Sequence, residues 1–418
     1  MRLWGEHPMR VRMLASLALA VTMLIVSCST TSSVDLSRKK DSAHDLIELL
    51  TLAEKGDSQA QYDVGLIYTN GWGVAQDHAS AAQWFRRAAE GGNAEAQFNL
   101  GIMYYKGMGV DRDYVQAARW FTVAAEFGYV KAQSNIAFMH SKGLGVDQDY
   151  VQAEKWYRRA GLQGDLESQK RLGDIYYHGT GLIQDPEEAA HWYLKAAAQG
   201  SADAQANLGD MYYRGVGVKK DPLEAIKWYK AASLQGNAHA QGCLGNIYLN
   251  GEGVPQDFSE AATWFRMAAE QGNSQAQGFL GYFYDHGLGT PQDFVEAARW
   301  YRLAADHGDA IIQFNLGLMY ATGKGVPQDY EEAARWFRKS AEQGYDKALY
   351  NLGILYSKGT GVPRDFLQAY LCFQLAADQG IQDAMVYLDV MARRMTPDQI
   401  AEAKEMAKAL KEATSTAN

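Results

Sequence analysis

The aspartates and glycine-rich loops are the features of this sequence that first suggest chemistry, but they recur too regularly for one active site. A Gly-x-Gly pair followed by an aspartate, as in Gly107, Gly109 and Asp113, returns about every 36 residues. A phosphate-binding loop would be unique and would carry Lys and Ser or Thr at the start of its helix. We therefore interpret the glycines and aspartates as helix caps and not as phosphate ligands or acid/base pairs.

The histidines and cysteines form no recognisable reactive set. The histidines of the repeat region fall at different repeat positions, without the spacing of zinc ligands: His78, His140, His178, His191, His239, His286 and His307. Cys243 and Cys372 stand more than three repeats apart. Packed helices lie roughly 8–10 Å apart and a disulfide needs Cα atoms within about 7 Å, so no bond between them is expected. We expect Cys372 to be buried and inert.

Hydrolase motifs are also missing. Neither Gly-x-Ser-x-Gly nor His-Glu-x-x-His occurs, and a nucleophile needs such a setting to be activated. The sequence therefore predicts a protein with no catalytic residues, no metal site and no cofactor. With a net charge of −9, the chain also lacks the basic surface that phosphate backbones require, which argues against nucleic acid as a partner.

Each 36-residue unit predicts two helices that would position any site. In one unit the first helix covers about 94–106, where Leu100 and Tyr104 share one face. Gly107 ends this helix, because glycine adopts the left-handed conformation without penalty. The second helix starts after Asp113, whose carboxylate can accept from the free N–H groups of the first turn. Its apolar face includes Trp120, and nearly every unit has Trp at this position.

This repeat resembles the Sel-one-like repeat, a relative of the tetratricopeptide repeat. The resemblance covers roughly 56–390 and recurs nine times. It implies an all-α fold, a right-handed α/α superhelical solenoid of about nine 36-residue helix-turn-helix repeats with capping helices. It also implies that the first helices line a concave groove and that the protein is an adaptor for other proteins. The residues that carry the resemblance are Gly107-x-Gly109-Val110-x-x-Asp113, Ala117-x-x-Trp120-Phe121, Ala124-Ala125, Gly128, Ala132-Gln133 and Gly173-x-x-Tyr176.

The segments outside the repeats differ in composition. We assign 42–55 to an N-terminal capping helix, 56–390 to the solenoid and 391–418 to a C-terminal capping helix and tail. Thr396 to Gln399 predicts the start of that last helix, with Thr at the N-cap and Gln three residues later. A solenoid needs such atypical ends to cover its terminal apolar faces.

The N-terminus predicts export. Arg10 and Arg12 precede an apolar stretch, 13–26, which is too short to span a membrane comfortably. The run that ends at Cys28 resembles a bacterial lipoprotein signal, which implies a signal peptide over 1–27, lipidation of Cys28 and a flexible tether over 28–41. The charged residues also suggest that translation starts at Met9. Ser29 after the cysteine implies an outer-membrane lipoprotein facing the periplasm. A secreted protein with Cys28 incidental is the alternative.

A variable stripe on the first helices is the candidate binding site. Positions 95, 98, 102 and 105 and their equivalents lie on one helix face and change from unit to unit. Constant positions maintain the fold, whereas variable ones are free to contact a partner. Ordinary scatter, or packing of these side chains against neighbouring repeats, is the alternative interpretation. The stripe residues proposed for binding are Phe98, Ile102, Tyr105, Phe138, Asp174, Tyr177, Asp210, Tyr213, Tyr282, Phe314, Leu318, Tyr350 and Ile354.

The function expected from these features is a non-catalytic protein–protein interaction scaffold at the bacterial cell envelope. Its partner would be an envelope or secreted protein bound in the groove, and the lipid anchor would be its contact with the membrane. The middle of the stripe, which is acidic and rich in tyrosine, suggests a segment with basic character. The alternative is a lipoprotein that organises exopolysaccharide secretion or peptidoglycan remodelling, with glycan contact through the same tyrosines and carboxylates.

Overall fold

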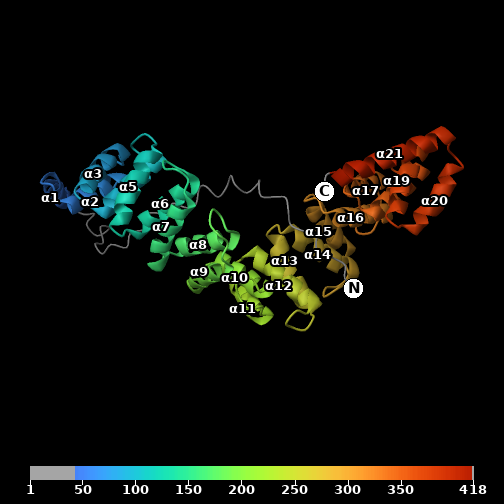
Figure 1. The fold of residues 1–418 in the computed structure, drawn as a ribbon, viewed down its shortest axis with the longest axis horizontal. Coiled ribbons are helices and arrows are strands. Elements are labelled where there is room, and N and C mark those ends of the chain that lie inside the picture. The colour runs from blue at the N-terminus through green and yellow to red at the C-terminus, as the bar shows by residue number, and fades with distance from the viewer. Residues whose placement is uncertain (1–42, 417–418) are drawn as a thin grey trace. The chain divides into compact units, whose positions relative to one another are not determined.

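The computed structural model describes residues 43–416, which form helices joined by short loops (Figure 1). After α1 (Ala43–Glu54), each repeat contributes a first and a second helix. The first helices are α2 (Ser58–Asn70), α4 (Ala94–Lys106), α6 (Val130–Lys142), α8 (Leu166–His178), α10 (Ala202–Arg214), α12 (Ala238–Asn250), α14 (Ser274–His286), α16 (Ala310–Thr322) and α18 (Asp346–Lys358). The second helices are α3 (His78–Glu90), α5 (Tyr114–Glu126), α7 (Tyr150–Leu162), α9 (Pro186–Ala198), α11 (Pro222–Ser233), α13 (Phe258–Glu270), α15 (Phe294–Ala305), α17 (Tyr330–Glu342) and α19 (Phe366–Asp378).

The helices group into two compact units, one ending at Ala196 and the other beginning at Ala197. In the first unit α4 packs on α5 and α5 on α6, and in the second unit α10 packs on α11 and α11 on α12. Within each unit these helices therefore bury their apolar sides against their neighbours along the chain, as a repeat array requires. The predicted fold class, an all-helical solenoid, is confirmed.

A glycine and an aromatic ring hold the two helices of a repeat together. A Cβ at Gly209 in α10 would lie 2.6 Å from a ring carbon of Tyr229 in α11, which is closer than real side-chain contacts. Only glycine therefore lets α11 approach α10 at this point. Gly173 and Tyr193 have the same relation in the first unit. The two tyrosine side chains are almost completely buried, each with a relative exposure of 1%.

In the first eight repeats a buried glutamine joins the first helix to the helix before it, and the ninth repeat has Leu349 at this position. The Gln241 amide in α12 donates to the carbonyl oxygen of Ser233 in α11 at 3.3 Å, and Gln97 in α4 does the same to Ala89 in α3 at 3.1 Å. An unpaired carbonyl at the end of a helix inside the protein would be costly. Equivalent bonds come from Gln61, Gln133, Gln169, Gln205, Gln277 and Gln313.

The predicted caps are present. Asp221 begins α11 by accepting from the backbone N–H groups of Leu223 and Glu224, both at 3.0 Å. Gly215 ends α10 in the left-handed conformation, with a φ of 71°. These bonds satisfy donors and acceptors that a helix end leaves open. The loop glycines and aspartates are therefore structural, as the sequence indicates.

The C-terminal helices are α20 (Gln382–Ala392) and α21 (Pro397–Thr416). The Thr396 N–H donates to the Gln399 side chain at 3.0 Å, and the Gln399 N–H donates to the Thr396 hydroxyl at 3.3 Å. This is the capping box expected from the sequence. The helix α21 packs on α19 with Ala403 buried between them.

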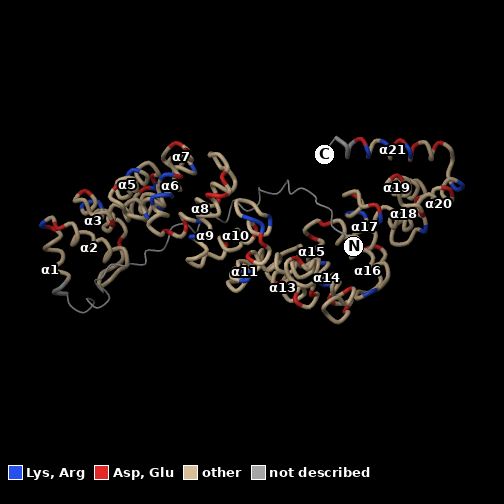
Figure 2. Tube along the Cα trace, turned by 60° about the horizontal axis from the view of Figure 1, so that its bottom comes forward, with Lys and Arg blue, Asp and Glu red and all other residues tan. Residues whose placement is uncertain are grey.

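Charged residues of both signs are interspersed along the helices of each unit, α21 included (Figure 2). Within residues 43–416, every helix is too short or too polar to cross a membrane. The expected signal peptide, the tether and Cys28 lie outside the described residues.

Candidate functional site

The thirteen stripe residues all lie on first helices, but they are not equally accessible. Phe98 and Phe314 have relative exposures of only 6% and 7%, so the expectation that they form part of an exposed surface is wrong. The other eleven are partly exposed, and many of them also pack on the core clusters of their own repeats. These eleven are Ile102, Tyr105, Phe138, Asp174, Tyr177, Asp210, Tyr213, Tyr282, Leu318, Tyr350 and Ile354.

The burial of the two phenylalanines has a local cause. The Phe98 ring centroid lies 5.1 Å from that of Tyr129, and the Phe314 centroid lies 5.2 Å from that of Tyr345. Both tyrosines stand at the residue before the next first helix, where most repeats have Asn, Asp or Ser. The tyrosine ring is larger than those side chains and covers the phenylalanine, so these two pairs are part of the packing between repeats.

Two aspartates at the middle of the stripe each accept a hydrogen bond from the buried tyrosine of the same repeat. The Tyr193 hydroxyl donates to the Asp174 Oδ1 atom at 2.7 Å, and the Tyr229 hydroxyl donates to the Asp210 Oδ1 atom at 2.6 Å. A buried phenol hydroxyl needs such a partner. These carboxylates therefore have a structural role in addition to the binding role proposed from the sequence.

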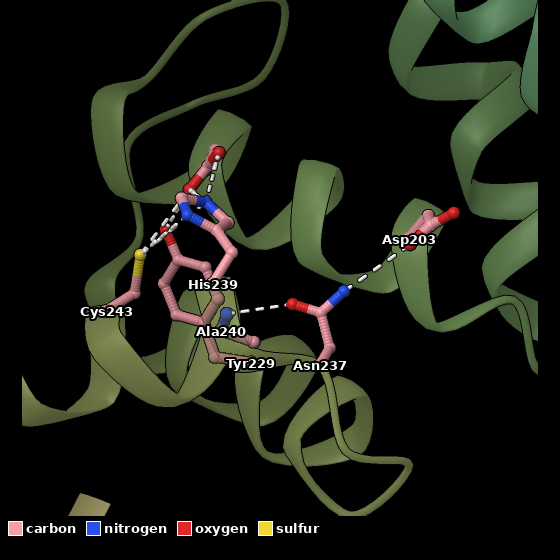
Figure 3. A network of polar contacts seen from close by, with 7 residues as sticks. Asp203, Tyr229, Asn237, His239, Ala240 and Cys243 are labelled. Carbon is pink, nitrogen blue, oxygen red and sulfur yellow. Dashed lines mark hydrogen bonds and ion pairs between the residues drawn. The ribbon is translucent and has the colours of Figure 1, made fainter. Parts of the chain in front are cut away.

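Asp210 also meets two side chains of the following repeat. The His239 Nε2 atom lies 2.9 Å from Asp210 Oδ2 and 3.1 Å from Oδ1. The Cys243 Sγ atom lies 3.6 Å from His239 Nε2 and 3.9 Å from Asp210 Oδ1. Figure 3 shows His239, Cys243 and the Tyr229 hydroxyl turned toward one another. Among residues 43–416, Asp210, His239 and Cys243 are the one group of three potential metal-binding side chains whose donor atoms lie within 4.8 Å of each other.

The backbone around this cluster is fixed by short-range bonds. Asn237 caps α12 by accepting from the Ala240 N–H at 2.9 Å, and its side-chain amide lies 3.5 Å from the Asp203 carboxylate (Figure 3). His239 and Cys243 are four residues apart on α12 and so lie on one helix face. The carboxylate of Asp210 comes from α10 and accepts the hydrogen bond of Tyr229, which lies in α11.

The pKa values of the two aspartates are shifted in opposite directions. Burial raises the pKa of Asp174, and the Tyr193 hydrogen bond offsets only part of that effect. Burial also raises the pKa of Asp210, but the hydrogen bond and charge of His239 outweigh it, so that the pKa is lowered overall. The Asp210 hydrogen bond in turn raises the pKa of His239 to about 10. At neutral pH the pair is therefore an ion pair, with the His239 side chain 54% exposed.

Comparison with known proteins agrees with this repeat architecture. Nine consecutive segments match the Sel1 repeat: 58–93, 94–129, 130–165, 166–201, 202–237, 238–273, 274–309, 311–345 and 346–381. The chain belongs to the Sel1 repeat family. Sel1 repeat proteins generally serve as protein–protein interaction scaffolds, and their fold is non-catalytic. No curated protein matches the chain.

Two solved Sel1-type structures are similar over most of the chain. One is the structure of c5321, described as a protective antigen present in uropathogenic Escherichia coli strains displaying an SLR fold. It shares 34% identity over 87% of this chain and 86% of its own, with a TM-score of 0.59. The other is a Sel1 repeat protein from Oxalobacter formigenes, with 32% identity over 77% of this chain and 92% of its own, and a TM-score of 0.62.

The two cysteines of the repeat region differ in their burial. Cys372 is buried with a relative exposure of 6%, and burial raises the pKa of its thiol to about 12. The predicted burial of that cysteine is confirmed. Cys243 occupies a different repeat position that is partly exposed. The expectation that the histidines lack ligand spacing is wrong for His239, because His239 and Cys243 are separated by one helical turn.

Proposed function

We propose that this Sel1 repeat protein is an exported lipoprotein, anchored in the outer membrane through Cys28, that binds an envelope or secreted protein along its first helices. The family supports the scaffold role. The observation that carries the binding surface is that the repeat positions of these eleven residues hold no constant residue type along the array, and that the eleven side chains remain partly exposed. Residues under a purely structural constraint would repeat, as the buried glutamines and the Gly–aromatic pairs do.

Aliphatic and aromatic residues are the main contacts we propose for the partner. Ile102 and Tyr105 in α4 and Leu318 in α16 are partly exposed apolar side chains, and burying apolar surface against a partner favours association. The carboxylates are weaker candidates than the sequence suggests. Asp210 is already paired with His239, and Asp174 accepts from Tyr193, so a basic segment or a sugar hydroxyl would compete with bonds inside the protein. This favours a protein partner over the glycan alternative.

The envelope location rests on the sequence before residue 43 and on one relative. The run ending at Cys28 has the pattern of a lipidation site. The Escherichia coli relative is described as a protective antigen, a property that fits a protein exported from the cell. Metabolic labelling with palmitate tests the anchor: we expect label in the wild-type chain and none in Cys28→Ala. Label retained in that variant would contradict the lipidation site.

The binding surface is tested by capture from solubilised membranes with the full-length chain. Leu318→Lys adds a charge to the stripe, whereas Val295→Lys adds the same charge to a residue of α15 that is 65% exposed. We expect Leu318→Lys to lose the captured protein and Val295→Lys to retain it, with equal helicity by circular dichroism. Equal capture by both variants would move the binding surface elsewhere. Retention on polysaccharide or murein, without a protein partner, would favour the glycan alternative.

A further inference from the structure

The imidazole and thiol beside Asp210 are not explained by the repeat fold. At the position of Cys243 most other repeats have Asn, as at Asn99, Asn135 and Asn315. Histidine occupies the position of His239 in this repeat alone. The helix α12 therefore carries two coordinating side chains one turn apart, whereas α10 and α14 have neither histidine nor cysteine at the equivalent positions. They face the one carboxylate of α10 that is already oriented by a tyrosine.

The arrangement does not match an activated cysteine nucleophile. In such a site the histidine uses one ring nitrogen for the thiol and the other for the carboxylate that orients it. Here both contacts fall on the same atom. His239 Nε2 is the nearer ring nitrogen to Cys243 Sγ, at 3.6 Å, and it is also the atom that meets Asp210 at 2.9 Å. The His239 Nε2, Cys243 Sγ and Asp210 Oδ1 atoms lie 3.1–3.9 Å from one another, which is the arrangement of ligands around a cation.

The separations fit a tetrahedral ion. Metal–ligand distances of about 2.0–2.3 Å place neighbouring donor atoms of a tetrahedral zinc site about 3.3–3.6 Å apart. The observed separations are 3.6 Å between sulfur and nitrogen, 3.1 Å between nitrogen and Asp210 Oδ1, and 3.9 Å between sulfur and the same Oδ1. Shifts of a few tenths of an ångström would bring all three to one metal. We propose that Asp210, His239 and Cys243 bind Zn²⁺, with water as the fourth ligand.

The ligand types select this class of cation. Ca²⁺ and Mg²⁺ prefer oxygen ligands throughout, so a thiolate and an imidazole count against them. Cu⁺ favours sites richer in sulfur. One thiolate, one imidazole and one carboxylate suit Zn²⁺, which accepts all three donors. On binding, the cation replaces the thiol proton of Cys243 and the Nε2 proton of His239, and both protons leave to solvent.

Tyr229 is a positioning residue for this site. Its hydroxyl donates to Asp210 Oδ1 at 2.6 Å, and this oxygen lies 3.1 Å from His239 Nε2, so the bond holds the carboxylate toward the histidine. Hydrogen bonds that orient a ligating carboxylate are part of most metal sites. The tyrosine ring is itself fixed against Gly209 by the packing of α11 on α10. The repeat core thus presents one ligand rigidly, and α12 supplies the other two.

The test is metal binding by the purified full-length chain after chelation and reduction. We expect one Zn²⁺ per chain by mass spectrometry of the dialysed protein. Co²⁺ in place of Zn²⁺ should give the visible bands of a tetrahedral site and a thiolate-to-cobalt charge-transfer band. His239→Ala and Cys243→Ser should each lower the affinity at least tenfold. His239 is half exposed, so its variant should keep the fold, as circular dichroism can verify.

Matched variants separate this site from adventitious binding. Asp174→Asn changes the same repeat position one unit earlier and should retain the metal, as should Cys372→Ala and Cys28→Ala. No metal in the wild-type chain would overturn the proposal. So would equal affinity in the wild type and Cys243→Ser, or a cobalt spectrum without the thiolate band. These readouts need no binding partner, so the zinc site and the scaffold function can fail separately.

Discussion

Asp174 and Asp210 occupy the same position in successive repeats, and each accepts a hydrogen bond from a buried tyrosine, yet their surroundings differ. Burial dominates the electrostatics of Asp174 and raises its pKa. Asp210 meets His239 and Cys243, and its pKa is lowered overall. In the sequence, the positions after Asp174 that correspond to His239 and Cys243 hold Asp203 and Asn207. The repeat core thus provides a carboxylate in both places, and two variable residues decide what it can bind.

The largest expected effect is one that the two repeats share. Tyr193→Ala and Tyr229→Ala each remove a fully buried ring, and we expect each to destabilise its repeat by about 3–5 kcal/mol. Hydrogen exchange of the amides in α9 and in α11 measures this locally. A much smaller loss at either site would mean that the glycine and the ring do not hold the two helices together.

Removing only the tyrosine hydroxyl should have different consequences in the two repeats. Tyr193→Phe and Tyr229→Phe each leave a carboxylate with one hydrogen bond fewer, at a cost of about 1 kcal/mol. If Tyr229 orients a metal ligand, Tyr229→Phe should also weaken Zn²⁺ binding by about 10- to 100-fold. Tyr193→Phe should leave Zn²⁺ binding unchanged. Titration calorimetry with the metal distinguishes the two variants, and equal affinities would remove Tyr229 from the site.

The caps provide a smaller effect that should again be equal. Asp185 accepts from the Glu188 N–H at the start of α9, and Asp221 accepts from the Glu224 N–H at the start of α11, both at 3.0 Å. Asp185→Ala and Asp221→Ala should each cost about 1 kcal/mol. Urea unfolding followed by circular dichroism measures the loss. A loss of binding without a loss of stability would show that these aspartates do more than cap helices.

The smallest effects should have opposite directions. The raised pKa of Asp174 means that the fold favours its neutral form, so the stability from this group is present at low pH and is lost as the pH rises through the raised value. Asp174→Asn should therefore keep or increase the melting temperature at pH 7. Asp210→Asn removes a half-exposed ion pair and should cost less than about 1 kcal/mol without metal. Melting temperatures at pH 7 in a chelator compare the two, and a shared direction would contradict the electrostatic difference.

Regularity decided how much of this molecule could be predicted from its sequence. The helix pairs, the caps and the capping box at Thr396 follow from residues that recur or from known local bonds. The burial of Phe98 and Phe314 was missed, although a tyrosine 31 residues later signals it in both cases. The stripe was defined within one helix, whereas accessibility depends on the residue that the next repeat places over it.

The cluster at Asp210 was missed for a similar reason. Comparing one repeat position at a time shows His239 as an isolated histidine and Cys243 as an isolated cysteine. Their meeting with Asp210 requires residues from three different repeat positions and from two adjacent repeats. Only the spacing of four between His239 and Cys243 was visible beforehand. The carboxylate that completes the group is brought to them by the packing of α10, α11 and α12.

The buried glutamines have a consequence for how such an array changes in length. Each one bonds to a carbonyl eight residues before it, at the end of the preceding helix, and the bond returns in the same form at successive junctions. Excising or duplicating one whole 36-residue repeat would place a glutamine amide next to an equivalent helix-end carbonyl, so the same bond could form at the new junction. Gain and loss of complete repeats is therefore a conservative change for this chain, whereas an insertion of any other length would interrupt the series.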